Sequence, residues 1–202
     1  MLKNEQRRQE TRNSILNAAT HCFALKGYDG TGVALICEEA GVSKGAFYYH
    51  FQSKEAVFLE LINNWLSEME KSLENIAMDA SPVPETLINM TGMLQAALQS
   101  ENVEKPLFLE LWIRASRDEN IRQNTILPYR KYRQLFTRLI EQGIAEGSLK
   151  PVDPDSAAQA ILSLASGMFL QGLMDPKGAD WEKAAADSIK FLLEGLKQNQ
   201  EG

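Results

Sequence analysis

The stretch that decides the fold lies at residues 40–51 and reads AGVSKGAFYYHF. Gly41 suits the left-handed backbone position that follows a helix, and Ser43 is a good N-cap for the next helix. Phe47 and Phe51 then stand four residues apart on one face of that second helix, as core residues do. The pattern predicts two short helices joined by a tight turn, with Val42 filling the angle between them.

The other face of the second helix is polar and unsuited to a core. It carries Tyr48 and Tyr49, with Lys44 at the helix N-terminus, where free amides already favour an anion. Gly45 and Ala46 are small enough to let the backbone approach a duplex closely. Phenols and an ammonium group suit contacts with phosphates, so this face predicts DNA binding. His50 is left with two interpretations, a phosphate contact or packing between helices.

The rest of the chain is also helical in pattern, because apolar residues recur three and four positions apart. We expect an all-α protein of about nine helices, with a helix-turn-helix domain at 1–52 and a larger helical domain at 53–202. Ser53 is expected to cap the fourth helix, and Pro128 to interrupt or kink a long one. The later helices are predicted at 84–100, 105–116, 119–146, 155–173 and 180–197.

Charge is distributed unevenly along the chain, whose formal net charge is −6. Residues 1–54 carry seven Lys/Arg and five Asp/Glu, and the other 148 residues carry fourteen and twenty-two. A basic end on an acidic body is typical of a protein that touches nucleic acid at one end.

Several classes of protein are disfavoured by the composition. No run of about 18 apolar residues or signal peptide is recognised, so a cytoplasmic protein without a membrane span is expected. Cys22 and Cys37 lie on apolar stripes and are expected in the core, with a redox switch as the minor alternative. His21 with Cys22 does not make a metal site, and no cofactor motif occurs. The two histidines lie in no nucleophile setting and no phosphate-binding loop is present, so we expect no enzyme.

A longer segment, GYDGTGVALICEEAGVSKGAFYYHFQSKEAVF at residues 27–58, closely resembles the DNA-binding region of TetR-type transcriptional regulators. The resemblance implies three helices followed by a helical ligand-binding and dimerisation body. It also implies phosphate anchoring by Thr31 and Lys54, and DNA contacts from the second helix of the motif. Those contacts are Ser43, Lys44, Gly45, Ala46, Tyr48, Tyr49 and His50.

The chain departs from the family pattern at two positions. Gly32 stands where the family usually has a capping Ser or Thr, and Ala34 where a basic or polar residue is common. Operator affinity is therefore expected to rest on the second helix of the motif and on an arm that carries Arg7, Arg8 and Arg12.

In the body, the last two helices mix small and large apolar residues, which allows close helix packing. The pattern fits either an internal core or a dimer interface, and the resemblance favours a homodimer through these helices. The small residues are Ala157, Ala160, Ala165, Gly167, Ala184, Ala185 and Ser188, and the large ones are Ile161, Leu164, Met168, Leu173, Trp181, Ile189, Leu192 and Leu196.

The middle helices carry methionines and aromatics, which line adaptable apolar pockets but are equally ordinary core. Glu110, Arg114 and Asn89 are candidates to orient a polar group of a ligand. The pocket candidates are Trp65, Met69, Met90, Met93, Phe108, Trp112, Phe136 and Met168.

We expect a ligand-responsive regulator, most simply a repressor that binds a palindromic operator and is released by a small, partly apolar effector. Two alternatives remain at this point: an effector-independent activator or architectural DNA-binding protein, and a helical adaptor with a vestigial helix-turn-helix.

Overall fold

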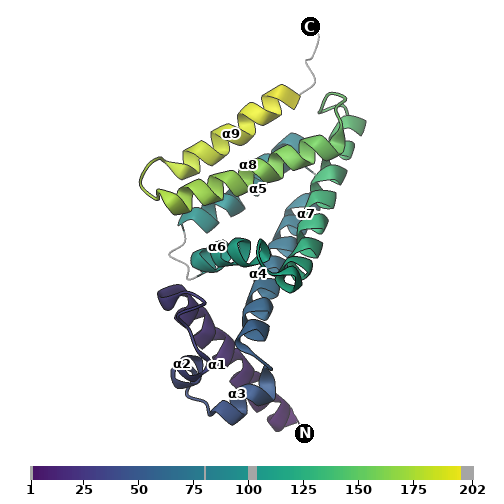
Figure 1. The fold of residues 1–202 in the computed structure, drawn as a ribbon. Coiled ribbons are helices and arrows are strands. Elements are labelled where there is room, and N and C mark those ends of the chain that lie inside the picture. The colour runs from purple at the N-terminus through teal and green to yellow at the C-terminus, as the bar shows by residue number, and fades with distance from the viewer. Residues whose placement is uncertain (1, 80, 100–103, 197–202) are drawn as a thin grey trace. The chain divides into compact units, whose positions relative to one another are not determined.

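The computed structural model describes the backbone of residues 2–79, 81–99 and 104–196, and within those ranges it contains nine α-helices and no β-strand (Figure 1). The all-α prediction is confirmed. The helices are α1 (Leu2–Lys26), α2 (Val33–Ala40), α3 (Lys44–His50), α4 (Lys54–Ala77), α5 (Val83–Gln99), α6 (Glu104–Ala115), α7 (Glu119–Ala145), α8 (Pro154–Met174) and α9 (Trp181–Leu196). Pro128 lies inside α7, which continues through it.

The chain divides into two compact units. The first comprises residues 1–66 with 102–125, and the second comprises 67–101 with 126–202. Both α4 and α7 contribute residues to each unit. The division differs from the expected boundary near residue 52, because the start of α4 and all of α6 belong with the three N-terminal helices.

The first unit has a core built from the faces that the helical periodicity predicted. Ile15, Ala19 and Phe23 of α1 are buried, as are Ile36 of α2 and Phe58 of α4. Cys22 and Cys37 are also buried and free, which confirms them as small core residues. Helix α1 packs against both α2 and α6.

Capping residues set the helix ends in this unit. Gly41 has φ 65° and ends α2, as predicted for a left-handed position. The Ser43 hydroxyl accepts a hydrogen bond from the Ala46 amide at 3.1 Å, and the Ser53 hydroxyl accepts one from the Ala56 amide at 3.1 Å. Gly32 precedes α2 without a side-chain cap.

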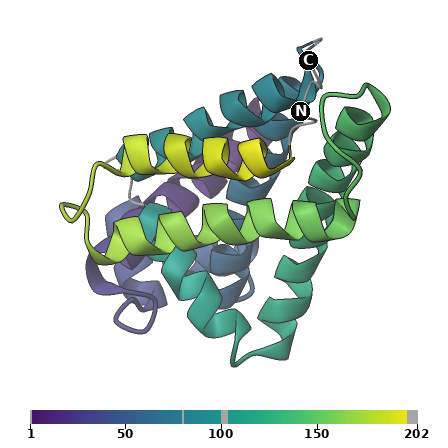
Figure 2. The same ribbon diagram turned by 90° about the horizontal axis from the view of Figure 1, so that it is seen from above.

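In the second unit, α5, α8 and α9 pack against one another, and they lie side by side in Figures 1 and 2. Their buried faces include Leu87 of α5, Ile161 of α8 and Leu193 of α9. Asp153 caps α8 by accepting from the Ser156 amide at 2.8 Å.

Helix α8 is long and apolar enough to cross a membrane by length and composition, with a mean hydropathy of 1.3 over its best window. This was not expected from the sequence. It is weak evidence for a membrane protein, because the core helix of a soluble protein passes the same test, and α8 packs against both α5 and α9.

Candidate nucleic-acid interface

Helix α3 separates its residues into a buried face and an outer face. Phe47 is fully buried and Phe51 nearly so, and their rings lie 6.0 Å apart. On the outer face Tyr48 is 55% exposed and Tyr49 70% exposed, and Lys44 is exposed as well. Two large apolar side chains thus hold the helix in place, while two phenols and an ammonium group face solvent.

Gly45 lies on the exposed side of α3 next to Ser43. A Cβ built there would meet only the Ser43 hydroxyl oxygen, at an ordinary contact distance of 3.7 Å. The glycine also has no positive φ, so the fold does not require it. The glycine therefore leaves the outer side of α3 open at this position. Ala46 is half-buried.

The expected basic arm is the first part of α1. Arg12 is half-buried, forms an ion pair with Glu60 of α4, and lies over the Phe51 ring at 4.8 Å. Arg8 lies 5.6 Å from the centre of the Tyr49 ring and is largely exposed. Only Arg8 of this pair adds positive charge beside the outer face of α3, because Arg12 joins α1 to α4.

His50 is half-buried at the end of α3. Burial lowers the pKa of its imidazole, and the charges of Arg8 and Arg12 lower it further. The ring of Tyr49 contacts it edge-to-face at 5.1 Å. A neutral imidazole packed beside α1 is the state that these neighbours favour near neutral pH.

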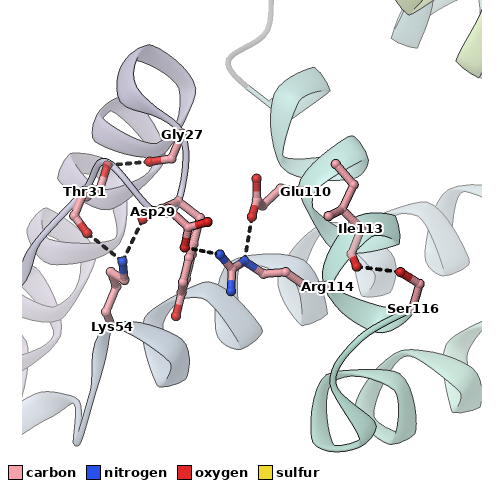
Figure 3. A network of polar contacts seen from close by, with 9 residues as sticks. Gly27, Asp29, Thr31, Lys54, Glu110, Ile113, Arg114 and Ser116 are labelled. Atoms are coloured by element: carbon pink, nitrogen blue, oxygen red, sulfur yellow. Dashed lines mark hydrogen bonds and ion pairs between the residues drawn. The ribbon is translucent and has the colours of Figure 1, made fainter.

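Thr31 is buried, with 1% of its surface exposed. Its hydroxyl lies 2.8 Å from the Gly27 carbonyl oxygen (Figure 3) and 3.0 Å from that of Cys22, so its proton is already engaged. This side chain closes the turn between α1 and α2. The phosphate contact implied by the resemblance does not suit its position, and we leave Thr31 out of the proposed DNA contacts.

Lys54 also points into the protein. Its amine donates to the carbonyl oxygens of Tyr28 and Thr31, at 2.7 Å each, and lies 4.0 Å from the centre of the Tyr28 ring (Figure 3). Burial lowers the pKa of this amine. Lys54 therefore ties the first turn of α4 to the α1–α2 turn, and the implied phosphate contact does not suit this geometry.

Tyr28 is the centre of this junction, although no local sequence pattern points to it. Its ring is buried, stacks on Phe23 at 5.3 Å and meets Phe58 edge-to-face at 5.1 Å. The Arg114 guanidinium of α6 lies 3.6 Å from the centre of the same ring.

The two other partners of Arg114 are carboxylates. It donates to Asp29 of the turn and to Glu110 one helical turn earlier, at 2.5 Å each (Figure 3). Burial opposes the charge on Arg114, but these hydrogen bonds raise its pKa. The suggestion that Glu110 and Arg114 orient a ligand is therefore unsupported, because they serve the α1–α2 turn. Asn89, the third of those candidates, is exposed.

The pocket candidates fall into two groups. Trp65, Phe108 and Trp112 form a row of rings in the first unit, with centres 5.5 and 6.1 Å apart, and Trp112 is largely exposed. The remaining candidates belong to the second unit. There Met90, Phe136 and Met168 are buried, and Met69 and Met93 are half-buried.

Two family models match successive parts of the chain. Residues 15–61 match the family model described as bacterial regulatory proteins, tetR family. Residues 90–196 match the model described as BetI-type transcriptional repressor, C-terminal, which spans more than half of the chain.

One relative from Bacillus subtilis matches over nearly its whole length. The chain is 29% identical to the HTH-type transcriptional regulator YfiR of Bacillus subtilis over 189 residues, covering 93% of this chain and 92% of the relative. A transcriptional regulator from Saccharomonospora viridis, solved in complex with choline, superposes with a TM-score of 0.82 at 21% identity, covering 95% of this chain and 100% of the other. FadR from Bacillus subtilis, solved in complex with stearoyl-CoA, gives 0.77 at 22% identity, covering 90% and 97%. At these identities the solved structures establish the fold.

Proposed function

Because the chain belongs to the TetR family of bacterial transcriptional regulators, we propose that it is a repressor that binds a palindromic operator as a homodimer and is released by a small, partly apolar effector. Members of this family are DNA-binding regulators and not enzymes. The observation that carries the proposal is the outer face of α3, where Lys44, Tyr48 and Tyr49 are exposed over a buried Phe47. A protein with this role acts in the cytoplasm, where its operator is.

The proposed DNA contacts follow from exposure on α3. Tyr48 and Tyr49 donate hydroxyls to phosphates or pack on thymine methyl groups, and Lys44 pairs with a phosphate. Ser43, Gly45 and Ala46 allow the helix N-terminus to approach the major groove closely. His50, half-buried at the end of α3, is proposed to border this surface.

Selection of genomic fragments by the purified protein, followed by anisotropy titrations at several salt concentrations, tests the proposal. We expect a palindromic site whose half-sites are about one helical turn apart, and an affinity that falls steeply with salt. Tyr48→Ala should weaken DNA binding without unfolding the protein. The matched control, Tyr129→Ala on α7, should leave DNA binding unchanged. A wild-type protein that binds no palindrome more tightly than random DNA would rule out this function.

The homodimer is supported by the faces of α8 and α9 that the protomer leaves exposed. Several residues expected at the interface lie in the protomer's own core, including Ala157, Ile161, Ala185 and Ile189. Other apolar residues remain exposed, namely Leu170 and Met174 of α8 and Phe191 of α9.

On each helix, small residues share a face with these exposed apolar residues. Ser163 and Gly167 precede Leu170 and Met174 on α8, at spacings of three and four residues. Ala184, Ser188 and Gly195 flank Phe191 on α9 at the same spacings. One narrow face per helix, with small residues for close approach and large ones for buried area, suits a two-fold interface.

Sedimentation velocity of Phe191→Glu tests the dimer, because a buried, unpaired carboxylate is costly at an interface. We expect the wild type to sediment as a dimer and the variant as a monomer. Leu127→Glu on α7, another exposed apolar side chain, is the matched control and should remain dimeric. A Phe191→Glu variant that dimerises as tightly as wild type would place the interface elsewhere.

The effector proposal rests on the aromatic and methionine side chains described above. We propose that effector binding shifts α4, and that this displaces α3 from its register on DNA. A hundredfold loss of operator affinity needs about 2.7 kcal/mol of differential binding, within the usual range of allosteric coupling. Choline and stearoyl-CoA, the ligands of the two similar structures, are the first probes to add to the operator complex. If no small molecule releases the operator, the effector-independent alternative replaces this part of the proposal.

A further inference from the structure

Helix α6 lies outside the helix-turn-helix in sequence but belongs to the same compact unit and packs against α1. At its C-terminal end Arg114 reaches the α1–α2 turn by two contacts. The guanidinium stacks on the Tyr28 ring at 3.6 Å and donates to Asp29, while Glu110 holds it from its own helix. A planar guanidinium can lie flat on a ring and at the same time donate hydrogen bonds in its own plane.

The turn held by Arg114 is also held by Lys54. The Lys54 amine contacts the same Tyr28 ring and donates to the carbonyl oxygens of Tyr28 and Thr31. Thr31 is followed by Gly32, the N-cap of α2. Arg114 of α6, the start of α2 and the first residue of α4 therefore meet at one turn.

We infer that Arg114 is a positioning residue for DNA binding, acting through Tyr28 and Asp29 to hold the α1–α2 turn and hence the start of α2. The inference rests on the proposed function, since it assigns a role in operator binding to a residue that does not touch DNA.

This role differs from a direct DNA contact and from simple core packing. Removing a direct phosphate contact would make operator binding less dependent on salt. The slope of log K against log[salt] would become shallower by about 0.9 per phosphate. A side chain that only stabilises the fold would change the unfolding midpoint but not the affinity of folded protein. A positioning residue changes the affinity and the local order of the turn, at an unchanged salt slope.

The test compares Arg114→Met and Arg114→Lys with the matched control Arg117→Met, an exposed arginine three residues further along. Operator affinity is measured well below the unfolding temperature at several salt concentrations, and amide hydrogen exchange is followed in the peptide that covers residues 28–35. We expect Arg114→Met to weaken operator binding about tenfold, the order appropriate for losing a stacked cation and its charge-assisted hydrogen bonds, with faster exchange in that peptide. Arg114→Lys should fall between this variant and wild type.

A double-mutant cycle with Asp29→Asn connects the effect to the turn. The Asp29 side chain is 91% exposed, so this change should leave the fold intact. Its effect on affinity should largely disappear in the Arg114→Met background, because the pair acts as one contact.

An unchanged affinity and exchange rate in Arg114→Met would overturn the inference, as would a reduced salt slope or strictly additive effects of the two substitutions. If the wild-type protein binds no operator, the proposed function fails. Exchange in residues 28–35 then decides by itself whether Arg114 holds the turn, since it needs no DNA.

Discussion

Replacing Lys54 by methionine separates two roles for this residue, an anchor for phosphate and a brace inside the protein. The resemblance to known regulators implies the first role. The structure directs the amine to the Tyr28 and Thr31 carbonyl oxygens at 2.7 Å each and over the Tyr28 ring. Methionine preserves most of the length and the apolar stem, and removes only the ammonium group.

The magnitude follows from two opposing effects. Hydrogen bonds to a charged group contribute about 1.5–3 kcal/mol each, so two of them set an upper bound of about 3–6 kcal/mol. Burial of the amine, which lowers its pKa, offsets part of this, and water reaches the half-buried site in the variant. We therefore expect a net loss of about 2 kcal/mol in the free energy of unfolding. For a protein of 202 residues that corresponds to a fall in Tm of about 4–8 °C.

The assay is thermal unfolding at a fixed protomer concentration, because dimerisation makes Tm depend on concentration. Operator titrations at several salt concentrations complete it. Lys44→Met is the matched control, since Lys44 is exposed at the start of α3. It should leave Tm unchanged and reduce the slope of log K against log[salt] by about one, the value for one lost phosphate contact. An unchanged Tm for Lys54→Met, together with a reduced salt slope, would refute the brace and restore the phosphate anchor.

Three further predictions concern other parts of the chain. Thr31→Val should lower the unfolding free energy by about 1–2 kcal/mol in urea titrations, since it deletes a buried, bonded hydroxyl; an unchanged midpoint would contradict the geometry of the turn. The folded-state pKa of His50 lies below its ordinary value of 6.5, so the unfolded chain binds a proton first and stability falls as pH falls below about 6.5. His50→Gln should flatten that pH dependence of the urea midpoint, and an unaltered slope would show that other groups cause it. Gly143→Ala should destabilise α7 by about 1–3 kcal/mol, because the new Cβ would lie 2.6 Å from the buried Leu149 side chain. Gly92→Ala, whose new Cβ meets nothing within 4 Å, should instead stabilise the protein; thermal unfolding measures both glycine variants.

Features that depend on neighbours in the chain were predictable from the sequence. Gly41 takes the left-handed position, and the hydroxyls of Ser43 and Ser53 cap the helices that follow them. Phe47 and Phe51 are buried because residues four apart share a helical face. Helix caps and amphipathic faces arise within one or two turns of chain, so a local pattern determines them.

The partners of the polar side chains of Lys54, Thr31 and Arg114 were not predictable in this way. Lys54 and Thr31 have the residue types of phosphate anchors, yet both serve the α1–α2 turn. Arg114 was considered for a ligand, and it pairs with Asp29, 85 residues away in sequence. Nothing within a few positions of either residue indicates that contact.

By itself the sequence therefore determined the nine helices in the described part of the chain, the caps at Gly41, Ser43 and Ser53, and the family to which the protein belongs. Only the tertiary structure decided that α6 joins the N-terminal helices in one unit, and which cations turn inward. The physical reason is that a helix face is set by local periodicity, whereas a flexible cation binds whichever carbonyl, carboxylate or ring the fold brings within reach.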